Sequence, residues 1–344
     1  MSLTDLPKPF FVLAPMDDVT DTVFRRVVDE CAVPDIYFTE FVNVDGLQSS
    51  GRKNLLKKLQ FTAQERPIIA QIWGKNPENY YKTAQQIADG SLAQEANALN
   101  NHDKNTKQKP LNFAGIDLNM GCPDKKIVKN GCCAAFINDR KLAGEVIEAT
   151  QKGASINKSN GRQIFLPVSV KTRLGFNEID YTWHEFLLGY NLDMLTVHGR
   201  TKKQMSKVPA NWDALGRIRK LRDNFASETL IVGNGDVMSR SQGVELTQQY
   251  GLDGIMIGRG VFSDPYVFSK KSPWLNMSKQ DRIDLYKKHV ELFASTWNNR
   301  ERPIQTLNKF CKIYINHFDG AKELREKLMN AKTTQELLGL LIKA

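Results

Sequence analysis

Three of the five cysteines in the sequence lie close together, between Ile116 and Phe136. Cys122 stands between a glycine and a proline at the end of an apolar run, and Cys132 and Cys133 follow as an adjacent pair. A cysteine can be a nucleophile, an acid, a metal ligand, half of a disulfide or a packing residue. Because an adjacent pair suits neither a zinc site nor a local disulfide, Cys122 is the candidate for chemistry.

Polar residues and glycines also end the other apolar runs of the sequence. The whole set is Met16, Glu40, Gln71, Asn119, Cys122, Lys171, Arg173, His198, Arg200, Asn234, Asp236, Gly258 and Arg259. In a barrel of parallel strands, the carboxyl ends meet on one face, where catalytic and ligand residues lie. Lys171 and Arg173 should point the same way, because side chains alternate along a strand. We therefore predict one polar site at these strand ends.

The last two of these ends read "GNGDV" and "IGRG", at Gly233–Val237 and Ile257–Gly260. Glycines let backbone N–H groups approach an anion, and the loops after strands seven and eight commonly bind phosphate in barrels. The guanidinium group of Arg259 adds a positive charge and paired N–H donors that can bind a phosphate. We favour phosphate binding, although tight turns also use glycine. Neither motif is GxGxxG, so a Rossmann dinucleotide site is not indicated.

Eight short runs must position these residues. They are Phe10–Met16, Ile36–Phe41, Ile68–Gly74, Ala114–Gly121, Pro167–Gly175, Met194–Arg200, Leu230–Asp236 and Gly254–Gly260. Helical periodicity fills most of the intervals, for example at 78–90 and 211–225. The alternation predicts an α/β fold, a (β/α)8 TIM barrel. A doubly wound sheet is the alternative, but it would not require eight strands.

The remaining segments predict a second domain and two insertions. After Trp274 the pattern is purely helical, so we predict a barrel domain at 1–270 and a C-terminal all-helical domain at 275–344. The polar intervals 91–110 and 153–163 precede strands. We therefore expect them to be surface insertions without chemistry, on the face away from the site.

The composition is that of a soluble globular protein, with 41% hydrophobic and 25% charged residues. No membrane-spanning run and no secretion signal is predicted. An odd number of scattered cysteines fits a reducing cytoplasm. The net charge is +10, and residues 270–344 hold 15 Lys and Arg against 8 Asp and Glu. That asymmetry favours a polyanionic partner, with a solvated helical face as the alternative.

Several motifs together resemble the tRNA-dihydrouridine synthases. They are "LAPMDDVTDTVFRR", "NMGCP", "VSVKTRLG", "LTVHGRT", "IVGNGD" and "DGIMIGRGVFSDPYVF", in that order. The resemblance runs from Phe11 to Phe268, and the segment "KFCKIYINHFDGAKELREKL" is also similar. It implies an FMN-dependent oxidoreductase that reduces the 5,6 double bond of a uridine in the tRNA D-loop, with NADPH as electron source.

The resemblance also implies roles for individual residues. Cys122 would be the proton donor, and Asn119, Arg173 and Arg200 would bind the substrate. The implied FMN-binding residues are Pro15, Met16, Asp17, Gln71, Lys171, His198, Asn234, Gly235, Asp236, Gly258 and Arg259. No metal is implied. Relatives usually carry small residues after Gly131, so Cys132 and Cys133 are interpreted as core residues at a helix start, and Cys31 and Cys311 as helix packing.

The chemistry of uracil reduction agrees with these roles. It requires a hydride at C6 and a proton at C5, and a flavin can deliver the hydride. A cation at Lys171 would stabilise the reduced flavin. A thiol with a pKa of about 8.5 is protonated at neutral pH and can donate the proton. The target uridine is expected to flip out of the folded tRNA into the pocket.

One loop departs from the family pattern, and two other functions are considered. After "HGRT" the chain has Met205 and Lys207 where relatives usually have an aromatic residue and a glycine, so the target uridine could differ. An FMN barrel acting on a small molecule, like the dihydroorotate dehydrogenases, would not need a basic helical tail. A non-catalytic RNA-binding barrel would not need Cys122, Lys171 and His198.

We expect a monomer whose helical tail and barrel mouth share a basic groove for tRNA. The candidate residues are Lys270, Lys271, Lys287, Lys288, Lys309 and Lys312. Contacts of lysines with phosphates give salt-sensitive affinity and little sequence readout, so the shape of the tRNA would select the target. Reversing the charges of Lys287 and Lys288 should then weaken tRNA binding and leave the flavin in place.

Overall fold

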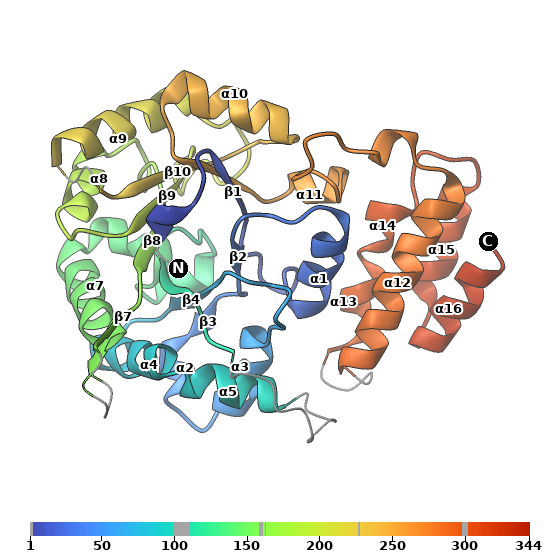
Figure 1. Cartoon of the computed structure of the whole chain (residues 1–344), viewed down its shortest axis with the longest axis horizontal. Coiled ribbons are helices and arrows are strands. Elements are labelled where there is room, and N and C mark those ends of the chain that lie inside the picture. Colours follow the sequence, from blue (N-terminus) through green and yellow to red (C-terminus); the bar gives the residue numbers. More distant parts are fainter. Residues whose placement is uncertain (1–2, 100–110, 158–160, 162, 226–227, 298–301) are drawn as a thin grey trace.

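The computed structural model describes residues 3–99, 111–157, 161, 163–225, 228–297 and 302–344 (Figure 1). The strands are β1 (Phe10–Leu13), β2 (Tyr37–Phe38), β3 (Val42–Asn43), β4 (Ile68–Trp73), β5 (Gly115–Asn119), β6 (Ser155–Asn157), β7 (Gln163–Phe165), β8 (Val168–Arg173), β9 (Met194–His198), β10 (Leu230–Asn234) and β11 (Gly254–Ile257).

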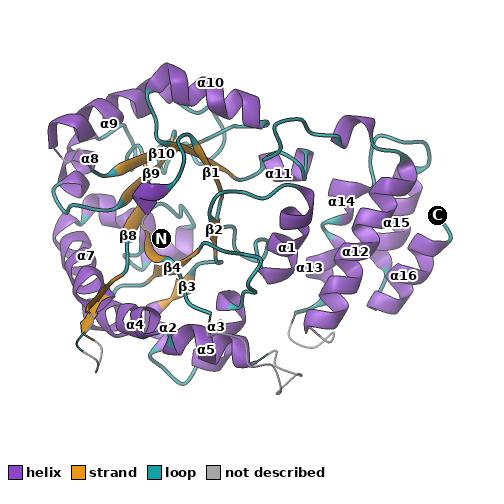
Figure 2. Cartoon of the chain, in the orientation of Figure 1, coloured by secondary structure: helices purple, strands orange, loops and turns teal. Residues whose placement is uncertain are grey.

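Helices surround the sheet and follow it (Figure 2). The α-helices are α1 (Thr22–Cys31), α2 (Val44–Leu47), α3 (Arg52–Leu56), α4 (Pro77–Asp89), α5 (Ser91–Ala98), α6 (Lys125–Lys129), α7 (Arg140–Ala154), α8 (Tyr181–Leu188), α9 (Trp212–Phe225), α10 (Arg240–Tyr250), α11 (Gly260–Ser263), α12 (Lys279–Trp297), α13 (Ile304–Asn308), α14 (Cys311–Tyr314), α15 (Ala321–Asn330) and α16 (Thr334–Ile342). Short 3-10 helices are η1 (Leu3–Asp5), η2 (Lys57–Leu59), η3 (Cys133–Asn138) and η4 (Trp274–Asn276).

The main sheet is a parallel barrel, which confirms the predicted fold. Its order is β1-β11-β10-β9-β8-β5-β4-β2, and β3 also pairs with β4. A parallel bridge between Val12 and Ile36 brings β1 and β2 together, with the Leu13 N–H donating to the Ile36 carbonyl at 3.1 Å. The closure gives eight strand positions, at the places where the sequence predicts strands.

The second strand position differs from the prediction, because the run Ile36–Phe41 is divided. Its strand β2 ends at Phe38, and β3 begins only at Val42. Between them the hydroxyl of Thr39, rather than a backbone carbonyl, accepts the N–H of Gln71 at 3.1 Å. A side-chain acceptor thus interrupts the ladder at the rim of the barrel.

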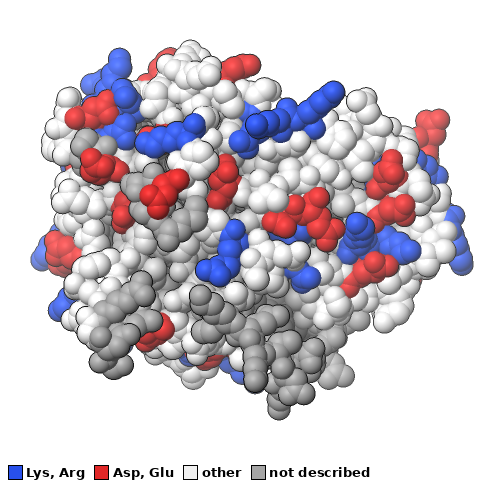
Figure 3. Space-filling model, in the orientation of Figure 1, with Lys and Arg blue, Asp and Glu red and all other residues white. Residues whose placement is uncertain are grey.

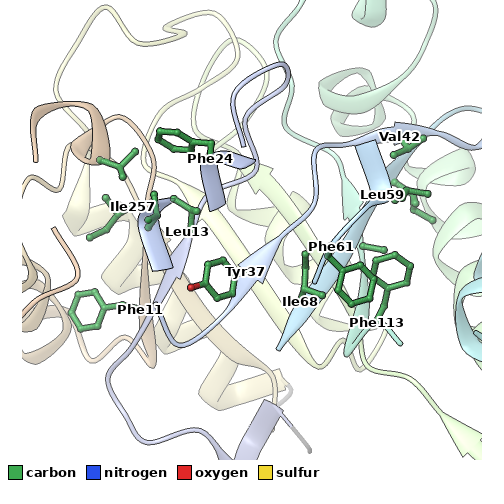
Figure 4. Packing of buried hydrophobic residues seen from close by; sticks show 14 of the residues in the cluster. Phe11, Leu13, Phe24, Tyr37, Val42, Leu59, Phe61, Ile68, Phe113 and Ile257 are labelled. Atoms are coloured by element: carbon green, nitrogen blue, oxygen red, sulfur yellow. The ribbon is translucent and has the colours of Figure 1, made fainter. Parts of the chain in front are cut away.

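Alternation along the strands separates two apolar layers. Phe11 and Leu13 of β1 point outward and pack against the helices, and Figure 4 shows Leu13 close to Ile257 of the neighbouring strand. Phe10 and Val12 point inward with Met194, Leu230, Val232 and Met256. Leu3 and Leu6 join this inner cluster, and η1 covers the barrel opening in Figure 1. The floor of the barrel is therefore apolar, and polar chemistry is confined to the other end.

Local signals set the ends of the barrel helices. In α4, Asn76 is the N-cap that accepts the Glu78 N–H, Pro77 opens the first turn, and Gly90 ends the helix at φ +87°. A left-handed residue after a helix favours glycine. Ser239 likewise caps α10, and Gly251 follows it at φ +68°. These helices return the chain from one strand end to the start of the next.

The two polar intervals contain more structure than predicted. The first was expected to be a surface insertion, but Ser91–Ala98 forms α5, and Leu92, Ala93 and Ala96 are buried in the core. In the second, Gly153 still belongs to α7, and β6 and β7 form an antiparallel hairpin. The remaining parts, 100–110, 158–160 and 162, lie outside the described residues.

The C-terminal helices, α12 to α16, pack beside α1 on one side of the barrel (Figure 1). Phe310 stacks on Phe24 of α1 with ring centroids 5.0 Å apart, and Trp297 donates to the Asp21 carboxylate at 3.1 Å. The predicted division into 1–270 and 275–344 stays a prediction. Among the described helices, none is long and apolar enough to cross a membrane.

Candidate active site

Cys122 lies in the loop after β5 and is held through its backbone. The Asn119 Oδ1 atom accepts the N–H groups of Gly121 at 3.1 Å and Cys122 at 3.0 Å. The carbonyl of Cys122 accepts the N–H of Ala134 at 3.3 Å. The loop therefore has little freedom, and the Cys122 side chain stays partly exposed at the barrel mouth.

The Cys122 thiol is more acidic than an ordinary cysteine thiol. A hydrogen bond from the Cys133 thiol lowers the pKa of Cys122 to about 7, and the charge of Arg173 acts in the same direction. The sequence-based expectation of about 8.5 omitted this contact. Cys133 is buried at the start of η3, as predicted for a core residue, but its thiol also contacts Cys122.

A buried amide chain lies behind the Cys122 loop. The Asn119 Nδ2 group donates to Gln71 Oε1 at 3.1 Å, and Gln71 Nε2 donates to Asp117 at 2.7 Å. Ser169 also donates to Asp117, at 2.6 Å. Burial raises the pKa of Asp117 to about 6. Asp117 is thus a polar anchor that the sequence analysis missed, although it stands two residues before Asn119 in the same inward register.

The strands next to β5 in the barrel, beginning with β8, carry cations at the same mouth. Lys171 is held near Asn234 Oδ1, at 3.3 Å, and burial lowers the pKa of Lys171 to about 8. Burial also lowers the pKa of His198 to about 2, and Lys171, Arg173, Arg200 and Arg259 lower it further. Arg200 Nη1 lies 3.0 Å from His198 Nε2. Because arginine can only donate, Nε2 accepts, and the neutral ring carries its proton on Nδ1.

The loops predicted to bind phosphate come together through Asp236. Its carboxylate pairs with Arg200 and with Arg259, the latter at 3.1 Å. The Arg259 side chain remains 60% exposed. A Cβ atom at Gly258 would meet only Ala14 and Met16, whereas one at Gly235 would lie 2.7 Å from the Ala210 Cβ. Gly235 therefore has a packing role, and its predicted role in cofactor binding stays a prediction.

The loop after β1 supplies the remaining predicted cofactor residues. Pro15 and Met16 are partly buried at the mouth, and Met16 N–H donates to Thr20 at 2.9 Å. Asp17 is exposed and pairs with Lys58. The carboxylates of Asp17, Asp18 and Glu40 gather within 4.8 Å of one another, and basic side chains pair with each of them.

The three predicted substrate residues already have protein partners. Asn119 is hydrogen-bonded to Gln71 and to the N–H groups of Gly121 and Cys122. Arg200 contacts the Val208 carbonyl as well as Asp236. Arg173 donates to the carbonyls of Gly121 at 2.7 Å and Met205 at 3.0 Å. Met205, in the loop that departs from the family pattern, has φ +53°. These three residues shape the mouth through contacts with the protein, and their role in substrate binding stays a prediction.

Comparison with known proteins identifies the family. The family model for dihydrouridine synthase (Dus) matches residues 12–101 and 102–344. The chain belongs to the dihydrouridine synthase family. This confirms the resemblance and the prediction of an oxidoreductase.

Individual dihydrouridine synthase relatives match over nearly the whole chain. A probable tRNA-dihydrouridine synthase 2 of Bacillus subtilis (strain 168) is 41% identical over 98% of this chain and 94% of its own length. A probable tRNA-dihydrouridine synthase of Staphylococcus aureus (strain COL) is 40% identical over the same shares. A solved morphinone reductase mutant in complex with tetrahydroNAD is similar at a TM-score of 0.45 and 12% identity, covering 78% of this chain and 87% of its own.

In this dihydrouridine synthase family member, the six candidate docking lysines lie in different places. Lys309 donates to the Asp18 carbonyl at 2.5 Å, so it lies at the mouth, and Lys312 lines the same apolar hollow as Lys309 and Phe310. Lys288 instead pairs with Glu30, near the end of α1 that is farther from the mouth. Lys270 lies beside Pro9 and Asp35, close to the starts of the strands. The structure therefore does not gather all six at the mouth.

Proposed function

We propose that this protein is a tRNA-dihydrouridine synthase that reduces the 5,6 double bond of a uridine in the tRNA D-loop. FMN is the proposed cofactor, NADPH the electron source, and Cys122 the proton donor. One observation carries the proposal: Lys171 of β8 pairs with Asn119 of β5, and Asn119 accepts the N–H of Cys122 at 3.0 Å, so the thiol and the ammonium belong to one barrel mouth. The reduction of a double bond by a flavin needs both a proton donor and a fixed cation.

The residues around the mouth fit an anionic cofactor. Four cations act together on His198, and Asp236 pairs with two of them, so positive charge is in excess there. Such a site suits a phosphate. The hydroxyl of Thr196, opposite Lys171 in the sheet, is buried and has no hydrogen-bond partner among the described residues. A buried polar atom of this kind supports the presence of a ligand.

The chain's own residues have separate tasks in this reaction. When bound, FMN supplies hydride transfer. With a pKa of about 8, Lys171 stays mainly protonated at neutral pH and stabilises negative charge above the barrel. His198 is neutral and can donate from Nδ1. With a pKa of about 7, Cys122 can hold a proton and release it to C5 of the uracil.

A tRNA substrate is favoured over a small molecule by the surface beside the mouth. Lys309 and Lys312 are exposed there, and Phe310 with Ile313 forms an apolar hollow beside them. On the face shown in Figure 3, basic and acidic side chains are interspersed over the C-terminal helices rather than segregated. We therefore place phosphate contacts at the mouth rather than along the whole tail.

Neutralising the mouth lysines should weaken tRNA binding. For Lys309→Gln with Lys312→Gln we expect weaker binding and a slope of log affinity against log salt that is shallower by about 2, because each lysine–phosphate contact releases about one counterion. The dissociation constant should be measured at several salt concentrations, and its salt dependence should fall in the variant. The matched control is Lys287→Gln with Lys288→Gln, in which Lys288 already pairs with Glu30. A larger loss in the control would place the tRNA elsewhere.

The function itself is tested with the purified protein. It should be yellow, and with NADPH it should form dihydrouridine in tRNA taken from a strain that lacks the modification. Colourless protein that FMN cannot reconstitute would support a non-catalytic RNA-binding barrel instead. Yellow protein that reduces a small pyrimidine but not tRNA would support the small-molecule alternative. A monomer and a cytoplasmic location are proposed with the function.

A further inference from the structure

We propose that Cys122 and Cys133 are a peroxide-sensitive pair that forms a reversible disulfide, with Cys133 as the resolving cysteine. The disulfide itself is independent of the proposed function. Its consequence rests on that function, because a disulfide would remove the proton donor from the barrel mouth.

The two cysteines are joined through both backbone and side chain. The carbonyl of Cys122 accepts the N–H of Ala134, the residue after Cys133, at 3.3 Å. The thiol of Cys133 donates to the sulfur of Cys122. A disulfide requires neighbouring backbones and thiols that can meet, and the Ala134 contact places the two backbones side by side.

The backbone of Cys133 favours a smaller residue than cysteine. Its φ is +55°, in the left-handed region, and Gly131, two residues before it, has φ +80°. A residue with a Cβ atom is strained at such an angle, because the Cβ atom crowds the following carbonyl oxygen. Glycine would avoid that strain. Cysteine is thus present at a position whose backbone conformation it does not prefer.

Only one of the cysteines is suited to react with a peroxide. Cys122 is partly exposed, and its pKa of about 7 leaves much of it as thiolate at neutral pH. Burial raises the pKa of Cys133, and also that of Cys132, whose sulfur lies 3.8 Å from the Asn130 carbonyl. A low-pKa, accessible thiol beside a second thiol is the arrangement of redox-sensitive cysteines.

The reaction balances with hydrogen peroxide as the oxidant. The Cys122 thiolate attacks one peroxide oxygen, an S–O bond forms, the O–O bond breaks, and one water leaves. The Cys133 sulfur then attacks the Cys122 sulfur, the S–S bond forms, the S–O bond breaks, and a second water leaves. Two electrons pass from the two thiols to the peroxide. A dithiol reductant reverses the change by exchange.

The test treats the flavin-loaded protein with hydrogen peroxide, alkylates it under denaturing conditions and maps the peptides by mass spectrometry. We expect a peptide that joins Cys122 to Cys133, with the protein lighter by two hydrogen atoms, and its disappearance after dithiothreitol. In Cys133→Gly, which relieves the left-handed strain, no such link can form. Cys122 should then carry a sulfenic acid that dimedone traps, followed by irreversible oxidation.

Two controls keep the outcome decisive. Cys132→Ser should form the Cys122–Cys133 link as the native protein does, and Cys133→Ser replaces Cys133→Gly if the glycine variant folds poorly. A native protein in which Cys122 is oxidised irreversibly as fast as in Cys133→Gly would overturn the proposal. So would a disulfide through Cys132. If the link forms but the reduced protein makes no dihydrouridine, the proposed function fails and the disulfide stands.

Discussion

Replacing Cys122 with alanine should lower the rate of dihydrouridine formation by about 10²–10⁴-fold, the usual contribution of a positioned general acid. The flavin spectrum and tRNA affinity should stay close to native, because the backbone bonds of Cys122 to Asn119 and Ala134 fix the loop and do not involve the thiol. The measurement is a single-turnover reaction of the reduced protein with unmodified tRNA. Full activity in the variant would mean that the proton comes from another group.

Two controls separate loss of the acid from loss of structure. Cys132→Ala removes a neighbouring buried thiol without touching Cys122 and should keep native activity. In the native protein the same single-turnover rate should fall as the pH rises through about 7, because the protonated thiol is the active form. The decline should approach about tenfold per pH unit. Cys133→Gly removes the hydrogen bond that lowers the pKa, so its decline should begin at a higher pH.

Replacing Arg302 with methionine should cost about 3–5 kcal/mol of unfolding free energy, the range for removing one partner of a buried ion pair. Arg302 is buried against Glu40, which is fully buried, and lies 3.4 Å from the Asp21 carboxylate. Burial raises the pKa of Glu40, and the charge of Arg302 opposes that rise. Without Arg302, Glu40 must bind a proton or remain a buried charge. The loss is measured from urea unfolding curves.

An exposed ion pair between α12 and α1 supplies the matched control for the loss of the buried pair. Lys288 and Glu30 are 3.6 Å apart and largely exposed, so Lys288→Met should cost less than about 1 kcal/mol. Combining Arg302→Met with Glu40→Gln should recover part of the loss, because no charge then remains at Glu40. If Arg302→Met costs no more than Lys288→Met, the buried pair does not stabilise the packing of these helices on the barrel.

Much of the fold could be predicted because strand and helix periods are local properties of the sequence. The positions of the strands could be predicted in this way, and Lys171 and His198 are near each other as expected. The division of the second strand could not be predicted, because it depends on the Thr39 hydroxyl meeting Gln71 of another strand. The α5 helix was missed because Gln and Asn dominate its surroundings and hide the apolar spacing of Leu92 and Ala96.

Within the site, the sequence gives residue types but not their partners. Cys133 could be predicted to be buried, but its contact with Cys122 depends on a left-handed backbone angle and on two loops that meet in the folded protein. Arg302 stands far from Glu40 in the sequence, and no periodicity links them. The positions of Lys309 and Lys288 differ for the same reason, because helix packing decides which lysine reaches the mouth.

The hydrogen bonds that link Asp117 to the Cys122 loop through Gln71 and Asn119 all donate toward Asp117. An ionised carboxylate can only accept, so Asp117 obliges Gln71 to present its amino group and leaves the Gln71 oxygen to Asn119. Asn119 must then turn its own oxygen to the N–H groups of the Cys122 loop. One buried negative charge thus decides which way two amides face. Because the pKa of Asp117 is about 6, its carboxylate fixes these two amide orientations at neutral pH. In acid a protonated Asp117 can donate a hydrogen bond, and the orientations are no longer fixed.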